Sequence, residues 1–474
     1  MNTPQYDLCI IGAGSGGLVA AAGAAGLGAK VILIEKHKMG GDCLNYGCVP
    51  SKALLQCAKV AHTQRTAQRF GIEPHNPHVD IGAVMQRVAT VIKAIEPHDS
   101  PERFRSLGVE VVFGSGQFTD PHTFFVNGHN ITARRFVLAT GSRAALPKLD
   151  GLSSVPYLTN ETVFSLNEPV PSLIILGAGP IGLEMAQAFT RLGTQVLVVQ
   201  RGKQILPKED ADIAAVVLEQ LRSEGVQFFL EHDTLRVTGG AGNIQLQIKG
   251  PSGEKTLQAT HLLIATGRQA NLDNLGLDVA GVTLEKGRLI LDRRLRTSNK
   301  NIYACGDITG HYQFTHTAEH EAGVVLRNAL FHWPAKIEQR VIPWCTFTDP
   351  EAARVGISET EAKAQGINHQ VYSFPFQDMD RAQTDGVTIG FAKIITDPKG
   401  RLLGAALVGP QAGEIIHEYV LAMAKNMKAA DLSGIIHIYP TLAQINRRVA
   451  DARLKAGLTP TLKKWIKFIF NLRG

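Results

Sequence analysis

Short apolar runs that end at glycine-rich turns divide much of the chain. The first, YDLCII (residues 6–11), has the character of a buried strand, and an alanine-rich helical stretch follows its glycines. A second apolar run, KVILIE, ends at Glu35. The same order recurs from residue 172, as SLIIL, a glycine turn, a helical stretch and a strand that ends at Gln200. This order predicts an α/β chain with two Rossmann-like dinucleotide-binding domains.

Each predicted unit has the glycine pattern G-x-G-x-x-G at its first turn. The glycines are Gly12, Gly14 and Gly17 in GAGSGG, and Gly177, Gly179 and Gly182 in GAGPIG. Glycine lets the backbone approach a pyrophosphate, and the N-terminus of the following helix faces the negative charge. Glu35 is placed to bind ribose hydroxyls. Two dinucleotide sites are therefore predicted.

The second unit departs from the first at the end of its second strand. Gln200 stands where an acid is expected, and Arg201 follows it. An acid would repel a 2′-phosphate, whereas arginine binds one through two hydrogen bonds. The sequence therefore favours NADPH at this site and leaves use of NADH open. Lys203 and Lys208 follow in a loop, where they are either further phosphate ligands or solvated side chains.

Composition narrows the class of protein. A chain of 474 residues implies two to four domains, and 19% charged with 44% hydrophobic residues is typical of a soluble globular protein. The net charge of +7 is spread along the chain, and no nucleic-acid-binding motif stands out, so nucleic acid is not an expected partner. The uncharged stretch at residues 8–29 contains seven glycines and lacks a preceding positive charge. We therefore expect neither a signal peptide nor a membrane span there, and a cytoplasmic location.

Taken in order, the motifs resemble the class I pyridine nucleotide-disulfide oxidoreductases. The matching segments are GAGSGG, GGDCLNYGCVPSK, LATGS, GAGPIGLE, ATGR, ACGD and TFTDPEAARVG, and they span nearly the whole chain. The resemblance implies FAD in the first fingerprint, a nicotinamide cofactor in the second, and a C-terminal α+β domain that forms a homodimer. The expected division is FAD domain 1–150 and 270–340, NAD(P)H domain 151–269, dimerisation domain 341–454 and tail 455–474.

The resemblance also implies roles for particular residues. Lys52 would lie beside the flavin and pair with Glu184, and Asp307 would contact the ribityl or pyrophosphate part of FAD. The other cofactor-binding residues expected from the motifs are Thr140, Gly141 and Gly267, besides the fingerprint glycines, Glu35, Gln200 and Arg201. No metal site is expected.

Cys43 and Cys48 form a redox-active disulfide if the resemblance holds. Five residues of regular helix rise about 7.5 Å, beyond the ~7 Å Cα separation that a disulfide spans, so the segment must bend, and Gly47 is the expected bend. Pro50 is placed to be the first residue of a helix, which puts Cys48 near a positive helix end. With Lys52 nearby, Cys48 is expected to be the flavin-facing thiolate and Cys43 the thiol that exchanges with substrate.

One segment differs from the disulfide-reducing members of the resembled family. Those enzymes have a segment like HxHPTxxE, in which the second His and the Glu move a proton. Here residues 437–444 read HIYPTLAQ, so Tyr439 and Gln444 occupy those positions, and a phenol with pKa near ~10 is a poor replacement for imidazole. Tyr439 resembles mercuric reductase at this position, although no cysteine follows Cys345. His437 is the alternative proton carrier.

These features predict an enzyme in which NADPH reduces FAD and FAD reduces the disulfide. The expected acceptor is a metal ion or other small electrophile, as in a mercuric reductase-like branch. The alternatives are a disulfide reductase or dihydrolipoamide dehydrogenase-type enzyme, and a membrane-associated redox partner of another protein. The last rests on the basic amphipathic tail TPTLKKWIKFIFNLRG, which fits the inner face of a membrane, a partner protein or its own dimer.

Overall fold

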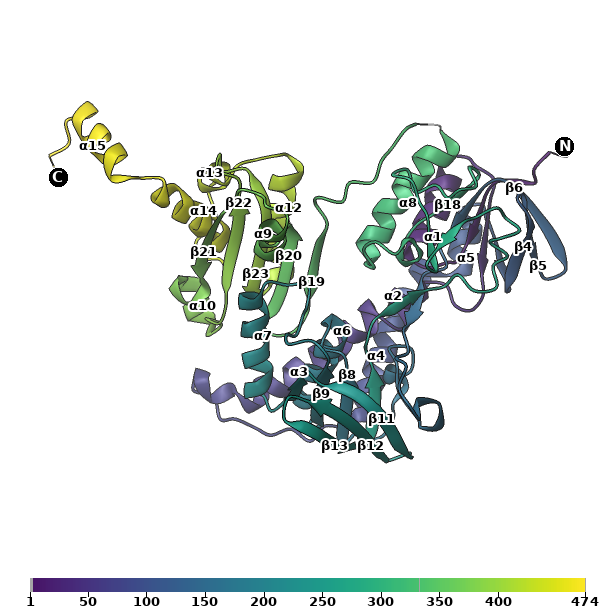
Figure 1. The fold of residues 1–474 in the computed structure, drawn as a ribbon, viewed down its shortest axis with the longest axis horizontal. Coiled ribbons are helices and arrows are strands. Elements are labelled where there is room, and N and C mark those ends of the chain that lie inside the picture. The colour runs from purple at the N-terminus through teal and green to yellow at the C-terminus, as the bar shows by residue number, and fades with distance from the viewer. Residues whose placement is uncertain (1–2, 332, 474) are drawn as a thin grey trace.

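A computed structural model describes residues 3–331 and 333–473. Figure 1 shows three lobes, with the N-terminus and the C-terminal helix at opposite ends of the molecule. Two lobes are built on largely parallel sheets and the third on an antiparallel sheet. The predicted α/β class, with two Rossmann-like domains and a C-terminal α+β domain, is confirmed.

The first lobe contains a seven-stranded sheet in the order β3-β2-β1-β6-β5-β4, with β18 also paired to β6. Its strands are β1 (Tyr6–Ile11), β2 (Val31–Glu35), β3 (Val109–Phe113), β4 (Gly116–Asp120), β5 (Thr123–Val126), β6 (His129–Leu138) and β18 (Ile302–Ala304). Successive residues of β1 enter two different hydrophobic clusters, so both faces of the sheet are buried. That burial explains why the strand is a continuous apolar run.

Helices position the redox segment against this sheet. α1 (Ser15–Gly26) and α8 (Thr315–Leu330) pack together. The remaining helices of the lobe are α2 (Gly41–Asn45), α3 (Cys48–Arg65), α4 (Ile81–Ile95) and α5 (Pro101–Ser106). The long α3 packs against a helix of the second lobe, so it joins the two nucleotide domains.

The second lobe repeats the parallel βαβ arrangement with the strand order β10-β9-β8-β14. Its elements are β8 (Ser172–Leu176), α6 (Pro180–Arg191), β9 (Gln195–Gln200), α7 (Ala211–Ser223), β10 (Gln227–Leu230) and β14 (His261–Ile264). An antiparallel sheet of β11 (Asp233–Gly240), β12 (Asn243–Gly250) and β13 (Gly253–Ala259) completes it. A short pair, β7 (Ser142–Ala144) and β15 (Arg268–Ala270), lies where the chain enters and leaves this lobe.

The third lobe is an antiparallel sheet covered by helices. The strand order is β19-β20-β23-β22-β21. The strands are β19 (Pro343–Thr346), β20 (Glu351–Gly356), β21 (Gln370–Pro375), β22 (Phe391–Thr396) and β23 (Leu402–Gly409). The helices are α9 (Glu359–Ala364), α10 (Asp380–Asp385), α11 (Ala412–Ile415), α12 (His417–Ala424), α13 (Ala429–Ser433) and α14 (Gln444–Ala456), and α15 (Pro460–Ile469) follows. None of the helices in the described ranges is long and apolar enough to cross a membrane.

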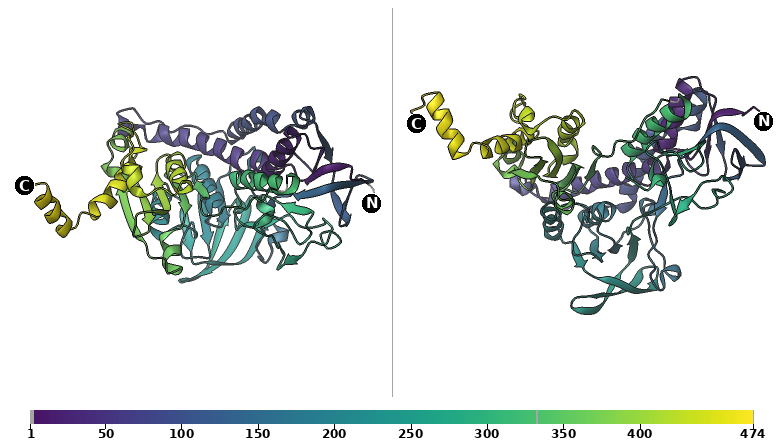
Figure 2. Two further views of the ribbon diagram at one scale, coloured as in Figure 1. Left: turned by 90° about the horizontal axis from the view of Figure 1, so that it is seen from above. Right: turned by 45° about the horizontal axis from the view of Figure 1, so that its top comes forward.

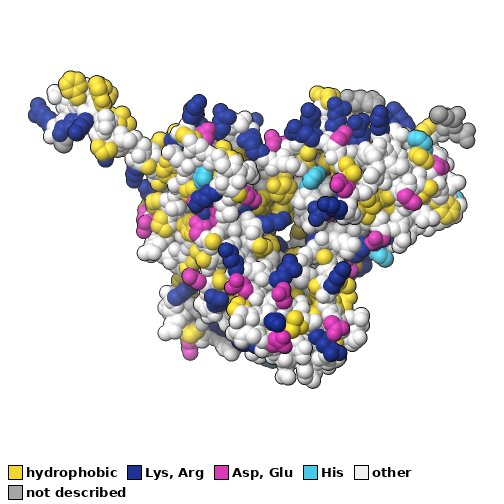
Figure 3. All heavy atoms as spheres, in the orientation of Figure 1, with side chains coloured by type: hydrophobic (Ala, Val, Ile, Leu, Met, Phe, Trp, Pro, Cys, Tyr) yellow, Lys and Arg dark blue, Asp and Glu magenta, His cyan; other side chains and the backbone are white. Residues whose placement is uncertain are grey.

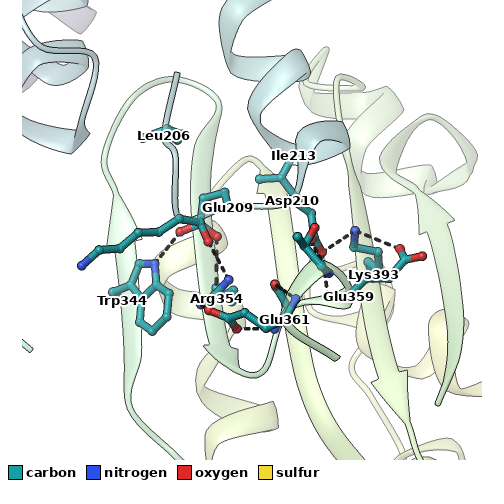
Figure 4. A network of polar contacts seen from close by, with 12 residues as sticks. Leu206, Glu209, Asp210, Ile213, Trp344, Arg354, Glu359, Glu361 and Lys393 are labelled. Carbon is teal, nitrogen blue, oxygen red and sulfur yellow. Dashed lines mark hydrogen bonds and ion pairs between the residues drawn. The ribbon is translucent and has the colours of Figure 1, made fainter. Parts of the chain in front are cut away.

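A buried polar network holds the second lobe to the third (Figure 4). Glu209 accepts a hydrogen bond of 2.6 Å from the indole Nε1 of Trp344. One residue later, Asp210 lies 2.9 Å from Lys393 Nζ and accepts hydrogen bonds from the backbone and side chain of Thr360. The Lys393 side chain is only 3% exposed. Burial alone would raise the pKa of Asp210, but the hydrogen bonds from Thr360 and Lys393 lower it overall.

We expect Lys393→Met to lower the thermal midpoint of the purified enzyme by several degrees. Removing one partner of a buried ion pair leaves an uncompensated charge, which costs about 3–5 kcal/mol. Arg381→Met is the matched control because its pair with Asp385 is exposed, and such pairs contribute about 0.3–0.5 kcal/mol. Differential scanning fluorimetry of both variants measures the difference. Equal midpoints for the two variants would contradict a stabilising role for the Asp210–Lys393 pair.

Candidate active site

A large cavity of about 2990 Å³ lies between the lobes. The space-filling view shows a hollow at the centre of the molecule, where the three lobes meet (Figure 3). Individual ligand pockets usually measure about 300–1,000 Å³, so this cavity has room for more than one ligand. Most of the predicted site residues line it: Cys43, Cys48, Lys52, Glu184, Gly12, Gly14, Glu35, Thr140, Gly141, Asp307, Gly177, Gly179, Gln200, Arg201 and Gly267.

The first glycine loop is shaped to receive a dinucleotide. Gly12 has φ +106°, and a Cβ there would lie 2.3 Å from the carbonyl oxygen of Ala139. Gly17 does not line the cavity; a Cβ on it would lie 1.9 Å from the carbonyl oxygen of Gly12, so it allows close packing of α1 on the loop. At the end of β2, Glu35 is buried and accepts a hydrogen bond of 2.7 Å from the backbone of Ala13.

The second loop repeats this geometry in the second lobe. Gly177 also has φ +106°, and a Cβ on Gly182 would lie 2.0 Å from its carbonyl oxygen. A Cβ on Gly179 would meet no protein atom within 4 Å, so this residue borders open cavity at the N-terminus of α6. Gln200 occupies the place of Glu35, since its Oε1 accepts a 3.2 Å hydrogen bond from the backbone of Ala178.

The basic side chains that follow β9 differ in whether they line the cavity. Arg201 and Lys208 line the cavity, whereas Lys203 does not. The backbone carbonyl of Lys208 accepts a hydrogen bond of 2.7 Å from Arg354, which fixes this part of the loop to the third lobe. The two cavity-lining cations therefore lie on the side of the cavity that the second glycine loop forms.

The cysteine pair lies where two short helical segments meet. Cys43 belongs to α2, and Cys48 is the first residue of α3. The expected bend is present at Gly47, whose φ of −129° and ψ of −107° precede α3. The prediction that α3 begins at Pro50 is wrong: the helix starts two residues earlier, because proline is tolerated where first-turn N–H groups have no helical partner. Cys48 therefore lies directly at the positive end of α3.

The two thiols are free and have opposite pKa shifts. A hydrogen bond from Cys43 lowers the pKa of Cys48 to about 6, further helped by Thr315 and Lys52 against the effect of burial. The same hydrogen bond, and then burial, raise the pKa of Cys43. The Thr315 hydroxyl lies 3.4 Å from the Cys48 sulfur. Near neutral pH this arrangement favours a Cys48 thiolate beside a protonated Cys43.

Lys52 and Glu184 form an ion pair beside the thiols. Lys52 Nζ lies 2.9 Å from Glu184 Oε2, and the Glu184 side chain is almost fully buried. The other oxygen of Glu184 accepts a 2.9 Å hydrogen bond from the backbone of Phe347. The Lys52 ammonium also lies 4.4 Å from the centre of the Phe347 ring. Residues of all three lobes therefore hold the positive charge near Cys48.

Asp307 is held by a second cluster at the cavity wall. Ser142 donates a hydrogen bond of 2.5 Å to its carboxylate, and Arg268 Nε lies 3.4 Å from the same oxygen. Arg268 also pairs with Asp42 at 3.1 Å, directly before Cys43 in the chain. Burial raises the pKa of Asp307 against the effects of Ser142 and Arg268.

Tyr439 is the one predicted catalytic residue that a single chain does not bring to the thiols. It does not line the cavity, its side chain is 64% exposed, and its hydroxyl donates to Asp380 at 3.0 Å. His437 is also away from the cavity, and its Nε2 lies 3.0 Å from Glu418. Either residue would need a second copy of the chain to meet the thiols.

Two residues at the site were not assigned from the sequence. Thr315 lies 267 positions from Cys48, and its segment FTHTAEH carries no cofactor or redox motif that would identify it. Arg268 ends the motif ATGR, from which the sequence predicts a role for Gly267 but none for the arginine. An arginine that directly follows the glycine of an expected cofactor motif is a signal that could have identified it.

Known proteins share this organisation. The sequence matches the pyridine nucleotide-disulphide oxidoreductase family over residues 6–322 and its dimerisation domain over residues 342–449. A dihydrolipoyl dehydrogenase from Chlamydia muridarum is 36% identical over 462 residues, or 96% of this chain and 97% of that protein. A mercuric reductase from Streptomyces lividans is 34% identical over 454 residues, or 94% of this chain and 96% of that protein.

A solved structure is similar over the same length. The Cu(II) complex of the HOCl-induced flavoprotein disulfide reductase RclA from Escherichia coli has a TM-score of 0.84 at 28% identity, covering 95% of this chain and 99% of that chain. The C-terminal match indicates a homodimer. The family and the enzyme class predicted from the sequence are confirmed. The chain therefore belongs to the FAD-dependent pyridine nucleotide-disulphide oxidoreductases.

Proposed function

We propose that this enzyme passes electrons from NADPH through FAD to the Cys43–Cys48 pair, and then to a metal ion or another small electrophilic acceptor. The observation that carries the proposal is the placement of Cys43 and Cys48 together at the cavity wall, with Cys48 at the N-terminus of α3 and 3.4 Å from the Thr315 hydroxyl. The lowered pKa of Cys48 and the raised pKa of Cys43 agree with this placement. The proposed division is that residues 1–150 and 270–340 hold FAD, 151–269 hold the nicotinamide cofactor and 341–454 form the dimer. The proposed location is the cytoplasm.

The residues around the cavity fit both cofactors. Gly12, Gly14 and Glu35 would receive the adenosine half of FAD, and Asp307 its ribityl or pyrophosphate part. Gly177, Gly179 and Arg201 would hold NADPH, with Gln200 leaving the 2′-phosphate unopposed by an acid. Thr140, Gly141 and Gly267 would complete the cofactor walls. Bound FAD supplies the two-electron chemistry that links a nicotinamide hydride to the disulfide.

The chain's own contribution is a thiolate held ready at neutral pH. Lys52 keeps a positive charge beside Cys48, while Glu184 fixes the position of that charge. When the reduced pair reacts, its two sulfurs lose two electrons and the single proton that remains on Cys43, and they form one S–S bond. The acceptor gains the two electrons. A metal ion bound by both sulfurs displaces the thiol proton of Cys43 itself, so no separate general acid or base is required.

Support for a metal acceptor comes from three directions. Tyr439 and Gln444 replace the proton-transfer pair of disulfide-reducing relatives. A mercuric reductase is among the relatives, and the RclA structure is a Cu(II) complex.

A second candidate function is disulfide or dihydrolipoamide chemistry. It is favoured by the His437–Glu418 pair, since a histidine held by a carboxylate is the usual arrangement of a general base. Asn446 holds the same carboxylate at 2.7 Å. In this alternative, His437 of one copy would move the proton for the thiols of the other.

The acceptor can be identified by NADPH consumption of the purified enzyme. We expect turnover with thiol-complexed Hg(II) or Cu(II), loss of that turnover in Cys43→Ser, and no effect of His437→Ala. Oxidised glutathione and lipoamide should turn over about a hundredfold more slowly, because general acid–base catalysis contributes about 10²–10⁴-fold. Rapid disulfide turnover that His437→Ala abolishes would replace the proposal with the second candidate.

The proposed contact between Arg201 and the 2′-phosphate of NADPH can be tested through the cofactor preference. We expect Arg201→Ala to lower kcat/KM for NADPH by about tenfold to a hundredfold, because hydrogen bonds to charged groups contribute about 1.5–3 kcal/mol. NADH should be unaffected, since it lacks the 2′-phosphate. Lys203→Ala is the matched control, because Lys203 does not line the cavity. An equal loss with both nucleotides would mean that Arg201 does not read the phosphate.

The thiol asymmetry tests the reactive centre directly. After reduction, alkylation of Cys48 by iodoacetamide should rise with pH through a midpoint of about 6, because the thiolate is the reactive form. Mass spectrometry of the modified peptide follows the rate at each pH. Cys43→Ala should move the midpoint upward, since Cys43 supplies the largest lowering effect. A midpoint near 8.5 in the unmodified protein, the value of an ordinary thiol, would exclude an activated Cys48.

A further inference from the structure

No helix or strand within residues 3–331 and 333–473 packs extensively against the C-terminal helix α15. No residue of α15 is buried, and every one except Ile466 is exposed. The two views in Figure 2 and the view in Figure 1 all show the helix projecting away from the third lobe. Its exposed apolar side chains include Trp465, Phe468 and Ile469, at 59%, 82% and 63% exposure. A surface outside this chain must cover them if they are to leave water.

The helix is also too short to be stable by itself. It has ten residues, and isolated helices below about 12–15 residues are marginal in water. Local signals start it: the Thr459 side chain accepts a hydrogen bond from the backbone of Leu462, and Pro460 is its first residue. A short helix with a good start and no packing is typical of a segment that forms fully on contact with a surface.

The side chains of α15 separate into two faces. At about 100° per residue, Leu462, Trp465, Ile466 and Ile469 fall within about 100° of one another. Lys463, Lys464 and Lys467 fall within a similar arc on the opposite side. In Figure 3 the projecting helix has hydrophobic side chains on one side and Lys or Arg on the other.

The charge of this end of the chain has one sign. After Asp451 the sequence contains no Asp or Glu. The basic residues of this end are Arg453, Lys455, Lys463, Lys464, Lys467 and Arg473. A surface that receives the apolar face and satisfies these cations must be negatively charged and extended.

We propose that α15 docks this enzyme on the surface of an anionic phospholipid membrane. The apolar face would lie at the boundary between headgroups and acyl chains, and the lysines would meet lipid phosphates. Trp465 suits that boundary, because its ring is apolar and its indole N–H is polar. The absence of carboxylates after Asp451 favours lipid over the same segment of a second copy. Two such segments packed together would bring only positive charges to the contact and could form no salt bridge with each other. A homodimer would present two such helices, which strengthens attachment without new contacts.

Vesicle flotation of the full-length holoenzyme tests the proposal. We expect binding to vesicles of equal parts phosphatidylglycerol and phosphatidylcholine, weakening as salt rises, and no binding to pure phosphatidylcholine. Each basic residue near an anionic surface strengthens binding about fivefold, so Lys463→Gln, Lys464→Gln and Lys467→Gln together should weaken it about a hundredfold. Replacing Trp465 and Ile469 by Ser should also reduce binding, because it removes the inserted side chains.

The matched control is Lys255→Gln, Lys399→Gln and Lys425→Gln, which removes the same charge from exposed sites elsewhere. This variant should bind like the unmodified enzyme, and all variants should keep NADPH oxidation in solution. Equal binding of the tail and control variants would overturn the proposal. A second outcome would also overturn it. If the unmodified enzyme bound neither kind of vesicle and light scattering showed that the tail variant is monomeric, α15 would belong to the dimer interface.

Discussion

The ion pair between Lys52 and Glu184 is the contact on which the redox site depends. Lys52 comes from α3 of the first lobe, Glu184 from α6 of the second, and the backbone of Phe347 in the third lobe binds the same carboxylate. A nearly buried carboxylate requires a charged partner and hydrogen bonds on its remaining oxygen, and here it has both. The start of α3, and with it Cys48, is thereby fixed between the two nucleotide domains.

The same backbone arrangement serves both nucleotide domains, with one chemical difference. Glu35 and Gln200 each end a second strand and each accept a hydrogen bond from the adjoining glycine loop. In the proposed assignment the carboxylate binds ribose hydroxyls, whereas the neutral amide does not repel a phosphate near Arg201. The two positions therefore differ in charge: the first loop has a carboxylate beside it and the second has a neutral amide.

The redox pair has an activated nucleophile, and the tyrosine expected beside it lies elsewhere. Cys48 has its pKa lowered by Cys43, the N-terminus of α3 faces it, and Thr315 and Lys52 add to the effect. By contrast, the only phenol expected at the site, Tyr439, lies on the outside of the third lobe. This combination supports the proposed acceptor, which binds sulfur and needs no protonation.

The sequence by itself determined the features that depend on neighbouring residues: the strands, the glycine loops, the strand-end residues Glu35 and Gln200, and the bend at Gly47. These follow from local backbone sterics and short-range periodicity. Only the tertiary structure decided which distant groups meet Cys48, because Thr315 reaches it through the packing of α8 rather than through any local pattern. The exposure of α15 is also visible only in the tertiary structure. An amphipathic sequence predicts that one face of a helix will be buried, but it does not identify the surface that packs against that face.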